Sequence, residues 1–339
     1  MKKYLIFTAV LSSSLLLSAA DPAAAEPSGS ASLAKSDPVQ ERKALNLQIV
    51  ELQKKGKHVE TLPLRKQILA LPLSDADRVT ELERIASLCM HTIRDQESGK
   101  KYFHEMIVLL RKQAASAKLP EKIRILERIG NIYKNQTREK DNAKKMYEEV
   151  IALSREALKD PAVSEKEKLQ HLSRIRNVSE SAGLPIEDVS AELLAAWKKR
   201  LAECGGLSPA EWLKEADPLA AVRQLSSISE EGYRLAASLA DKVLAMPEAG
   251  KNEKNSVAGT MVNAAYRFKN SAEILKYTEK QAEVTQSGVW TLRLGELYFR
   301  QERNLAKARE IFASVRDGEQ YDAKSRESAA LWLEMLSDD

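Results

Sequence analysis

Apolar residues recur every three or four positions through most of the chain, which is the spacing of one face of an α-helix. Between residues 39 and 55 they fall at Leu45, Ile49 and Leu52, and a second such segment runs from 59 to 71. Gly56 interrupts the pattern between them, so the two segments are predicted to form an antiparallel helical hairpin. The same criteria predict helices at 77–92, 98–117, 120–135, 141–159, 164–182, 184–204, 230–246, 254–269, 272–286, 289–301, 305–315 and 321–336, with short helices in 208–227.

Two stretches, 82–111 and 126–155, repeat one another at a spacing of 44 residues. Aligned without gaps, they are identical at 11 of 30 positions, where ordinary residue usage gives about 2 by chance. A period of this length indicates one helical unit stacked on copies of itself. The chain is therefore predicted to be all-α, an extended array of hairpins that works by binding. The identical pairs are Leu82/Leu126, Glu83/Glu127, Arg84/Arg128, Ile85/Ile129, Arg94/Arg138, Lys100/Lys144, Lys101/Lys145, Glu105/Glu149, Ile107/Ile151, Leu109/Leu153 and Arg111/Arg155.

The N-terminus has the layout of a secretory signal peptide. Lys2 and Lys3 precede an apolar run at 4–17, and small residues follow. We expect a signal peptide at 1–20, with residue 25 as a second cleavage position, and an exported protein that is periplasmic or secreted. An uncleaved anchor is the alternative, although the apolar run is short for a membrane span. Residues 21–38 are rich in Ala, Ser and Pro and are predicted to form a flexible linker.

Composition supports a helical array and argues against a nucleic-acid partner. Aromatic residues make up 5% and charged residues 30% of the chain, a profile typical of helical solenoids. The 53 basic and 49 acidic residues are interspersed, so a nucleic-acid partner is not expected. No later apolar stretch approaches the length of a membrane span. Gly205 and Gly206 divide the mature chain into predicted helical regions at 39–204 and 205–339.

The two cysteines, Cys89 and Cys204, lie 115 residues apart in the sequence. In an array whose units contact mainly their neighbours, they are not expected to meet as a disulfide. Cys89 aligns with Tyr133 in the repeat, a position that faces the core. A buried thiol is therefore predicted at Cys89.

One set of spacings resembles the tetratricopeptide repeat (TPR) family. The pattern G-x2-Y-x9-A-x3-Y-x2-V begins at Gly130, and the same spacings begin again at Gly295. The resemblance implies an α-solenoid of stacked antiparallel hairpins in a right-handed superhelix, with small residues where two helices approach. This chain has ten residues from Tyr to Ala where the family has nine, and its period is 44 rather than 34. The implied structural positions are Gly130, Tyr133, Ala143, Tyr147, Gly295, Tyr298, Ala308 and Phe312.

In similar proteins the first helix of each hairpin lines a concave groove that binds a peptide or a protein. Asn131 matches a peptide-binding position of the members that clamp chaperones, but Glu127 stands where those members have a lysine. Recognition of a C-terminal carboxylate is therefore not expected. The groove positions that the resemblance implies are Thr80, Glu83, Ser87 and Met90 in one unit and Arg124, Glu127, Asn131 and Lys134 in the next.

The sequence does not indicate an enzyme, a metal site or a cofactor. It holds four histidines, of which His91 and His104 would face each other across one hairpin, but no third ligand is evident. It contains no phosphate-binding glycine loop and no Gly-x-Ser-x-Gly motif. The sequence therefore predicts no catalytic residue, no cofactor and no metal site.

Two functions remain. The favoured one is a protein interaction scaffold of the bacterial envelope. The alternative is a structural or accessory subunit that acts by self-association or beside an enzymatic partner. A monomer that retains envelope proteins would favour the first function, and a stable oligomer without other partners would favour the second.

Overall fold

The computed structural model describes residues 37–337, and these residues form helices joined by turns, without a strand among them. The expectation of an all-α chain is confirmed. The predicted signal peptide and nearly all of the predicted linker lie outside the described residues. The helices are α1 (Pro38–Lys54), α2 (Thr61–Ala70), α3 (Asp75–Ser87), α4 (Gln96–Ser116), α5 (Leu119–Ile132), α6 (Lys140–Ala157), α7 (Glu165–Ala182), α8 (Glu187–Glu203), α9 (Pro209–Glu215), α10 (Pro218–Leu225), α11 (Glu230–Ala245), α12 (Lys251–Arg267), α13 (Ser271–Thr285), α14 (Gly288–Arg300), α15 (Leu305–Asp317) and α16 (Ala323–Met335).

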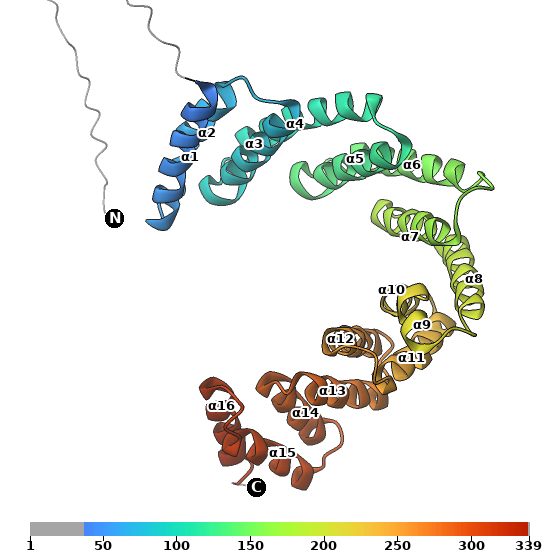
Figure 1. Ribbon diagram of the computed structural model, residues 1–339. Helices are drawn as coiled ribbons and strands as arrows, with labels where there is room; N and C mark the ends of the chain where they lie inside the picture. The colour runs from blue at the N-terminus through green and yellow to red at the C-terminus, as the bar shows by residue number, and fades with distance from the viewer. Residues whose placement is uncertain (1–36, 338–339) are drawn as a thin grey trace, which may run out of the picture.

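The helices follow one another along a curve that is open on one side, with α1 and α16 at its ends (Figure 1). Close packing joins helices that are neighbours in the sequence or next but one. In the N-terminal half, α3, α5 and α7 lie on the inner side of the curve and α4, α6 and α8 on its outer side (Figure 1). A surface made of several hairpins therefore faces the inside of the curve.

Polar side chains fix where many of the helices begin. Ser164 accepts a hydrogen bond from the amide of Glu167, whose carboxylate accepts one from the amide of Ser164, which is a capping box. In front of α9, the amide of Ser208 donates to the Glu211 carboxylate at 3.3 Å, and the Ser208 hydroxyl donates to the same carboxylate at 2.5 Å. Asp37 caps α1, so this helix begins at Pro38, the last residue of the range predicted to be linker, because a capping aspartate followed by proline starts a helix.

The turns that close the repeated hairpins share an unusual geometry. The π-helical turns η1 (Leu88–Ile93) and η2 (Tyr133–Thr137) are followed by Arg94 and Arg138, whose φ angles are 65° and 61°. After each arginine, the next backbone amide donates to a carbonyl six residues earlier, where a regular α-helix spans four. The bonds run from Asp95 to Cys89 at 2.9 Å and from Glu139 to Tyr133 at 2.8 Å.

The hairpin of α14 and α15 closes with the same hydrogen bond. The amide of Asn304 donates to the carbonyl of Tyr298 at 2.9 Å, and Arg303, the residue before Asn304, has a φ of 51°. A π-type turn holds more residues than an α-helical turn. This wider turn accounts for the ten-residue spacing from Tyr to Ala in both occurrences of the pattern.

The predicted structural positions pack in the hydrophobic core, with one exception. A Cβ on Gly130 would lie 2.6 Å from the ring of Tyr147, and a Cβ on Gly295 would lie 2.5 Å from the ring of Phe312. Each glycine therefore admits an aromatic ring from the second helix of its own hairpin. Tyr298 is only partly buried, whereas Tyr133, Ala143, Tyr147, Ala308 and Phe312 are buried.

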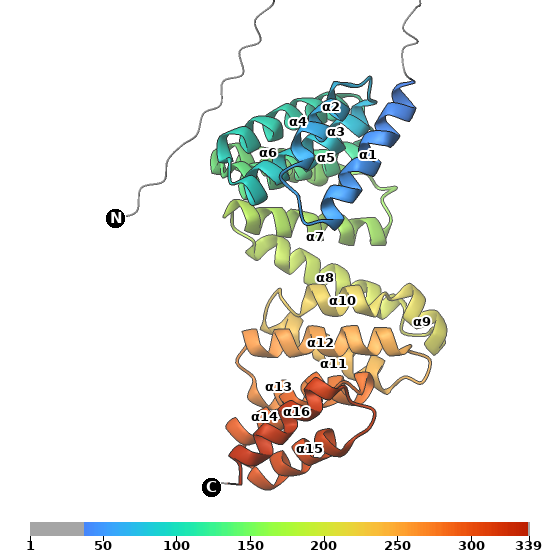
Figure 2. The same ribbon diagram turned by 90° about the vertical axis from the view of Figure 1, so that its left-hand side faces the viewer.

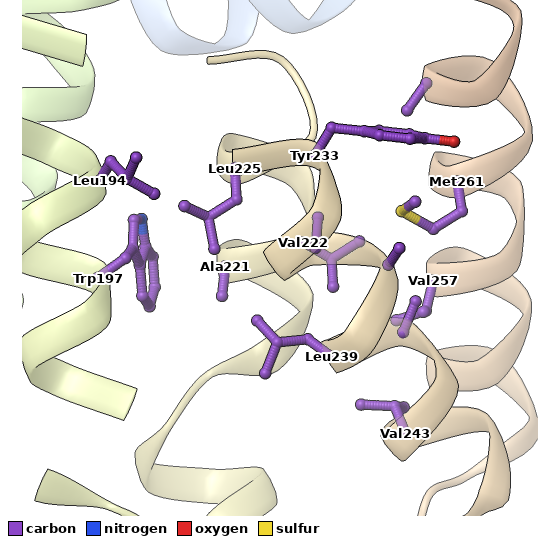
Figure 3. Close-up of a cluster of buried hydrophobic side chains, with 14 of the residues drawn as sticks. Leu194, Trp197, Ala221, Val222, Leu225, Tyr233, Leu239, Val243, Val257 and Met261 are labelled. Atoms are coloured by element: carbon purple, nitrogen blue, oxygen red, sulfur yellow. The ribbon is translucent and has the colours of Figure 1, made fainter. Parts of the chain in front are cut away.

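The core continues through the middle of the chain, where the repeat is degraded. Figure 2 shows α8 lying between the N-terminal helices and the C-terminal ones. The predicted boundary at 204/205 falls in the turn after α8. Extensive backbone packing does not cross this junction within the described residues. Side chains bridge it instead: Leu194 and Trp197 of α8 point toward Leu225 and Ala221 of α10 (Figure 3).

Both cysteines are free, and both are buried. Burial raises the pKa of the Cys89 thiol, with a smaller contribution from the Asp95 carboxylate. Within residues 37–337, no helix combines the length and the apolar composition that crossing a membrane requires.

Candidate functional site

A groove lies between α3 and α5, two helices of the inner side of the curve. Its cavity has a volume of about 350 Å³. Five of the eight predicted groove residues line it together: Glu83, Ser87, Arg124, Glu127 and Asn131. Phe103, Arg128, Ile132, Asn135 and Gln136 complete the lining.

The other three predicted residues do not line this cavity. Thr80 is exposed on α3, and its hydroxyl donates to the carbonyl of Ala76 at 2.9 Å. Lys134 is exposed in η2. Met90 is a wrong prediction, because its side chain is buried, with only 6% exposed, and lies against Gly99 of α4. The π-helical turn that begins at Leu88 rotates the face of α3, so Met90 points into the core.

Asn131 is held in place by the buried Tyr147. The Tyr147 hydroxyl donates to the Asn131 side-chain oxygen at 2.7 Å. Burial raises the pKa of Tyr147, and the Glu127 carboxylate raises it further, so the hydroxyl stays a neutral donor. The side-chain NH2 group of Asn131 then remains available to a ligand in the groove. The ring that fills the space beside Gly130 thus also orients a groove residue.

The charged residues of the groove form ion pairs that connect successive inner helices. Arg128 of α5 contacts Glu83 of α3 at 2.9 Å, and Arg174 of α7 contacts Glu127 of α5 at 3.1 Å. Glu83 and Glu127 are equivalent positions of the 44-residue repeat. Glu127 stands where the chaperone-clamping TPR proteins have a lysine. In this chain it forms an ion pair with Arg174 of the next hairpin. Because these charges are balanced, the groove is polar without a strong excess of either sign.

A second cavity continues the groove toward α1 and α2. Its volume is about 500 Å³, and it shares Glu83 and Ser87 with the first cavity. Together the two cavities extend the inner surface across three hairpins. The other residues that line the second cavity are Gln53, His58, Thr61, Arg65, Arg84, Leu88, His91 and Thr92.

The sequence patterns missed several of the lining residues for identifiable reasons. Arg128 is one of the identities of the repeat, but an identity alone does not distinguish a groove residue from a structural one. Asn135 and Gln136 belong to η2, where the helical spacing used to assign groove positions fails. Phe103 reaches the cavity from the outer helix α4.

Among residues 37–337, no group of three or more His, Cys, Asp and Glu side chains is placed to hold a metal ion. His104 contacts the carboxylate of Glu139 at 2.9 Å. No protein-family model matches the chain, and no curated protein matches it. The candidate site therefore rests on the geometry of these helices.

Proposed function

We propose that the chain is a non-enzymatic protein interaction scaffold that binds a peptide or a segment of a partner protein along its inner groove. The observation that carries this proposal is the cavity between α3 and α5, in which five residues implied by the groove pattern gather. Concave surfaces of stacked helical repeats are extended binding surfaces.

The chemistry of the groove favours an extended peptide segment. Asn131, Asn135 and Gln136 supply amides that can donate to and accept from a peptide backbone, and the buried Phe103 and Ile132 lie beneath them in the lining. Both carboxylates of the lining are already paired with an arginine, Glu83 with Arg128 and Glu127 with Arg174. A ligand of strong net charge is therefore less suited to this cavity than a mixed, mainly uncharged segment.

The proposed architecture is a TPR-like α-solenoid in a right-handed superhelix. The pairs Gly130 with Tyr147 and Gly295 with Phe312 support it, because the same close contact recurs in distant hairpins. The departure of one residue from the family spacing lies within the wide turns that end at Arg138 and Arg303. On this proposal the π-type turn is an insertion into the repeat that leaves its packing unchanged.

We place this function in the bacterial envelope on the strength of the N-terminal sequence. Lys2, Lys3 and the apolar run at 4–17 would direct export. Mass spectrometry of the protein recovered from cells is the test. A new N-terminus near residue 21 or 26 supports export, and an intact Met1 in the cytoplasmic fraction contradicts it.

Affinity capture from an envelope extract tests the binding function. The wild type is compared with Ser87→Trp and Asn135→Trp, which fill the groove, and with Glu148→Trp, a matched change at an exposed position of the outer helix α6. The proposal predicts a protein that the wild type and the Glu148 variant retain and the two groove variants lose. Equal retention by all four chains would reject the groove.

Self-association is the second candidate function, and exposed apolar residues favour it. Leu47 on α1 is 61% exposed and Leu331 on α16 is 62% exposed, so both end helices present apolar side chains outward. A second copy of the chain would cover them. Light scattering at micromolar concentration tests this: a stable oligomer that Leu331→Glu dissociates favours self-association, and a monomer rejects it.

A further inference from the structure

A separate cavity lies where α7 meets α10, between the N-terminal and C-terminal halves. Its volume is about 360 Å³. Its residues on α7 are spaced by three and four positions, so they share one face of that helix. The polar residues that line it are Ser173, Arg176, Asn177, Arg223, Gln224 and Ser227.

Arg176 is buried in the wall of this cavity without a close counter-ion. Only 9% of its side chain is exposed. One terminal nitrogen, Nη2, donates to the carbonyl of Ser227 at 2.8 Å. The other, Nη1, lies 3.8 Å from the carboxylate of Glu180, and Nε has no hydrogen-bond partner among the described residues. The free-energy cost of moving this guanidinium out of water is therefore largely uncompensated.

A second buried arginine of this chain has a buried carboxylate as its counter-ion. Among residues 37–337, Arg65 is the other arginine whose side chain is buried. Its Nη1 lies 2.8 Å from Oε1 of Glu81, a carboxylate that is itself 2% exposed. Arg176 has no such partner, because Glu180 is 62% exposed and lies beyond hydrogen-bond distance. The positive charge of Arg176, which lines the cavity, therefore has no buried counter-charge.

The rest of the lining adds to this positive charge. Arg223 also lines the cavity, and its Nη2 donates to the hydroxyl of Ser256, a neutral group, at 3.0 Å. The described residues that line the cavity include two arginines and neither Asp nor Glu. Asn177 and Gln224 can donate further hydrogen bonds. The groove between α3 and α5 differs, because Glu83 and Glu127 balance its arginines.

We propose that this cavity binds an oxyanion, a carboxylate or phosphate group, between Arg176 and Arg223. Guanidinium groups bind both anions through charge-assisted hydrogen bonds. The bound anion supplies the counter-charge that Arg176 lacks. This site is distinct from the peptide groove, and its occupancy does not depend on the function proposed for that groove.

Thermal unfolding of the full chain at constant ionic strength tests the site. Inorganic phosphate and succinate are titrated separately, with sodium chloride adjusted to hold the ionic strength. A ligand that binds the folded chain raises the unfolding midpoint progressively once its concentration exceeds the dissociation constant, because the stabilisation grows as RT ln(1 + [L]/Kd). We expect this rise in the wild type and at least about tenfold weaker apparent affinity in both Arg176→Met and Arg223→Gln. A rise with phosphate alone or with succinate alone identifies the anion that the site prefers.

Two controls separate this site from general electrostatics and from misfolding. Arg234→Met removes an exposed arginine elsewhere, and its titration should match the wild type. Arg223→Gln changes an exposed side chain, so it tests the site even where Arg176→Met lowers stability. No rise of the unfolding midpoint in the wild type, or the same apparent affinity in the wild type and both cavity variants, overturns the proposal.

Discussion

The ring of Tyr147 occupies the space that a side chain on residue 130 would need: a Cβ there would lie 2.6 Å from Cε1 of the ring and 2.9 Å from Cδ1. Tyr147 is buried and donates its hydroxyl to Asn131, so the ring is held at both ends and cannot easily move aside. The packing of α5 against α6 and the orientation of Asn131 in the groove therefore both depend on the contact between Gly130 and Tyr147.

Replacing Gly130 should destabilise the protein. We expect Gly130→Leu to lower the free energy of unfolding by about 1 to 3 kcal/mol, because the new side chain overpacks against Tyr147. Urea denaturation measures the change. Gly206→Leu is the control, since nothing lies within 4 Å of a Cβ at that position. Equal effects at the two glycines would mean that close packing at Gly130 does not matter.

The left-handed backbone at Arg138 gives a second prediction. A side chain in this conformation costs about 1 to 2 kcal/mol, which glycine avoids at the expense of a more flexible unfolded chain. Arg138→Gly should therefore leave stability unchanged or raise it by up to about 1 kcal/mol. Arg138→Val should lower it by about 1 to 3 kcal/mol, because a β-branched residue fits this region poorly.

Lys145→Val, at an exposed position inside α6, is the control for the change to valine. It should cost only the difference in helix propensity, less than about 1 kcal/mol. If denaturation finds Arg138→Gly less stable than Arg138→Val, the turn does not adopt a positive φ in solution.

The buried ion pair between Arg65 and Glu81 joins α2 to α3, and its two halves should not be independent. Arg65→Met alone leaves the Glu81 carboxylate buried with only Arg84 as a partner, at 3.2 Å, and should cost about 3 kcal/mol. The double change with Glu81→Leu should recover most of that loss. A double-mutant cycle by denaturation measures the coupling, and additive effects would contradict the pairing.

The environment of Tyr277 predicts that the stability of the protein depends on pH in the alkaline range. Burial raises the pKa of Tyr277, and the carboxylates of Asp241 and Glu273 raise it further. Because the pKa in the folded chain lies above the unfolded value of 10.0, this hydroxyl contributes stability that is present below about pH 10 and is lost as the pH rises above it. Stability of the wild type should therefore fall more steeply above pH 10 than that of Tyr277→Phe.

The same comparison at pH 7 measures the hydrogen bonds of this hydroxyl. It donates to the carbonyl of Ala237 and to Asp241, both at 3.2 Å. Tyr277→Phe should cost about 1 kcal/mol at pH 7. Tyr266→Phe, at a tyrosine that is 38% exposed, is the control. Parallel curves for the wild type and Tyr277→Phe above pH 10 would contradict the predicted shift.

Helical periodicity and the 44-residue repeat predict the all-α fold, and small residues at Gly130 and Gly295 mark the close contacts. The partner in each contact could not be predicted, because it depends on how far each turn rotates the two helices. The turns that begin at Leu88 and Tyr133 are π-helical, and no local propensity distinguishes them from ordinary helix ends. For the same reason, helical spacing predicts Met90 in the groove although it lies in the core.

The cavity between α7 and α10 could not be predicted from the sequence for a different reason. Arg176 lies in a helix that no longer follows the repeat, and an arginine in a helix is ordinarily exposed. In the folded chain, the turn after α10 places the carbonyl of Ser227 beside it. That contact spans 51 residues and joins the two halves of the chain.

Site-specific photo-crosslinking in cells that express the protein tests the binding function most directly. A benzophenone amino acid is placed at Asn135 in the inner groove and, as the matched outer position, at Glu148 on α6; both side chains are exposed. We expect a covalent adduct with another protein from position 135 and none from position 148. Equal adducts from the two positions, or adducts from position 148 alone, would contradict it.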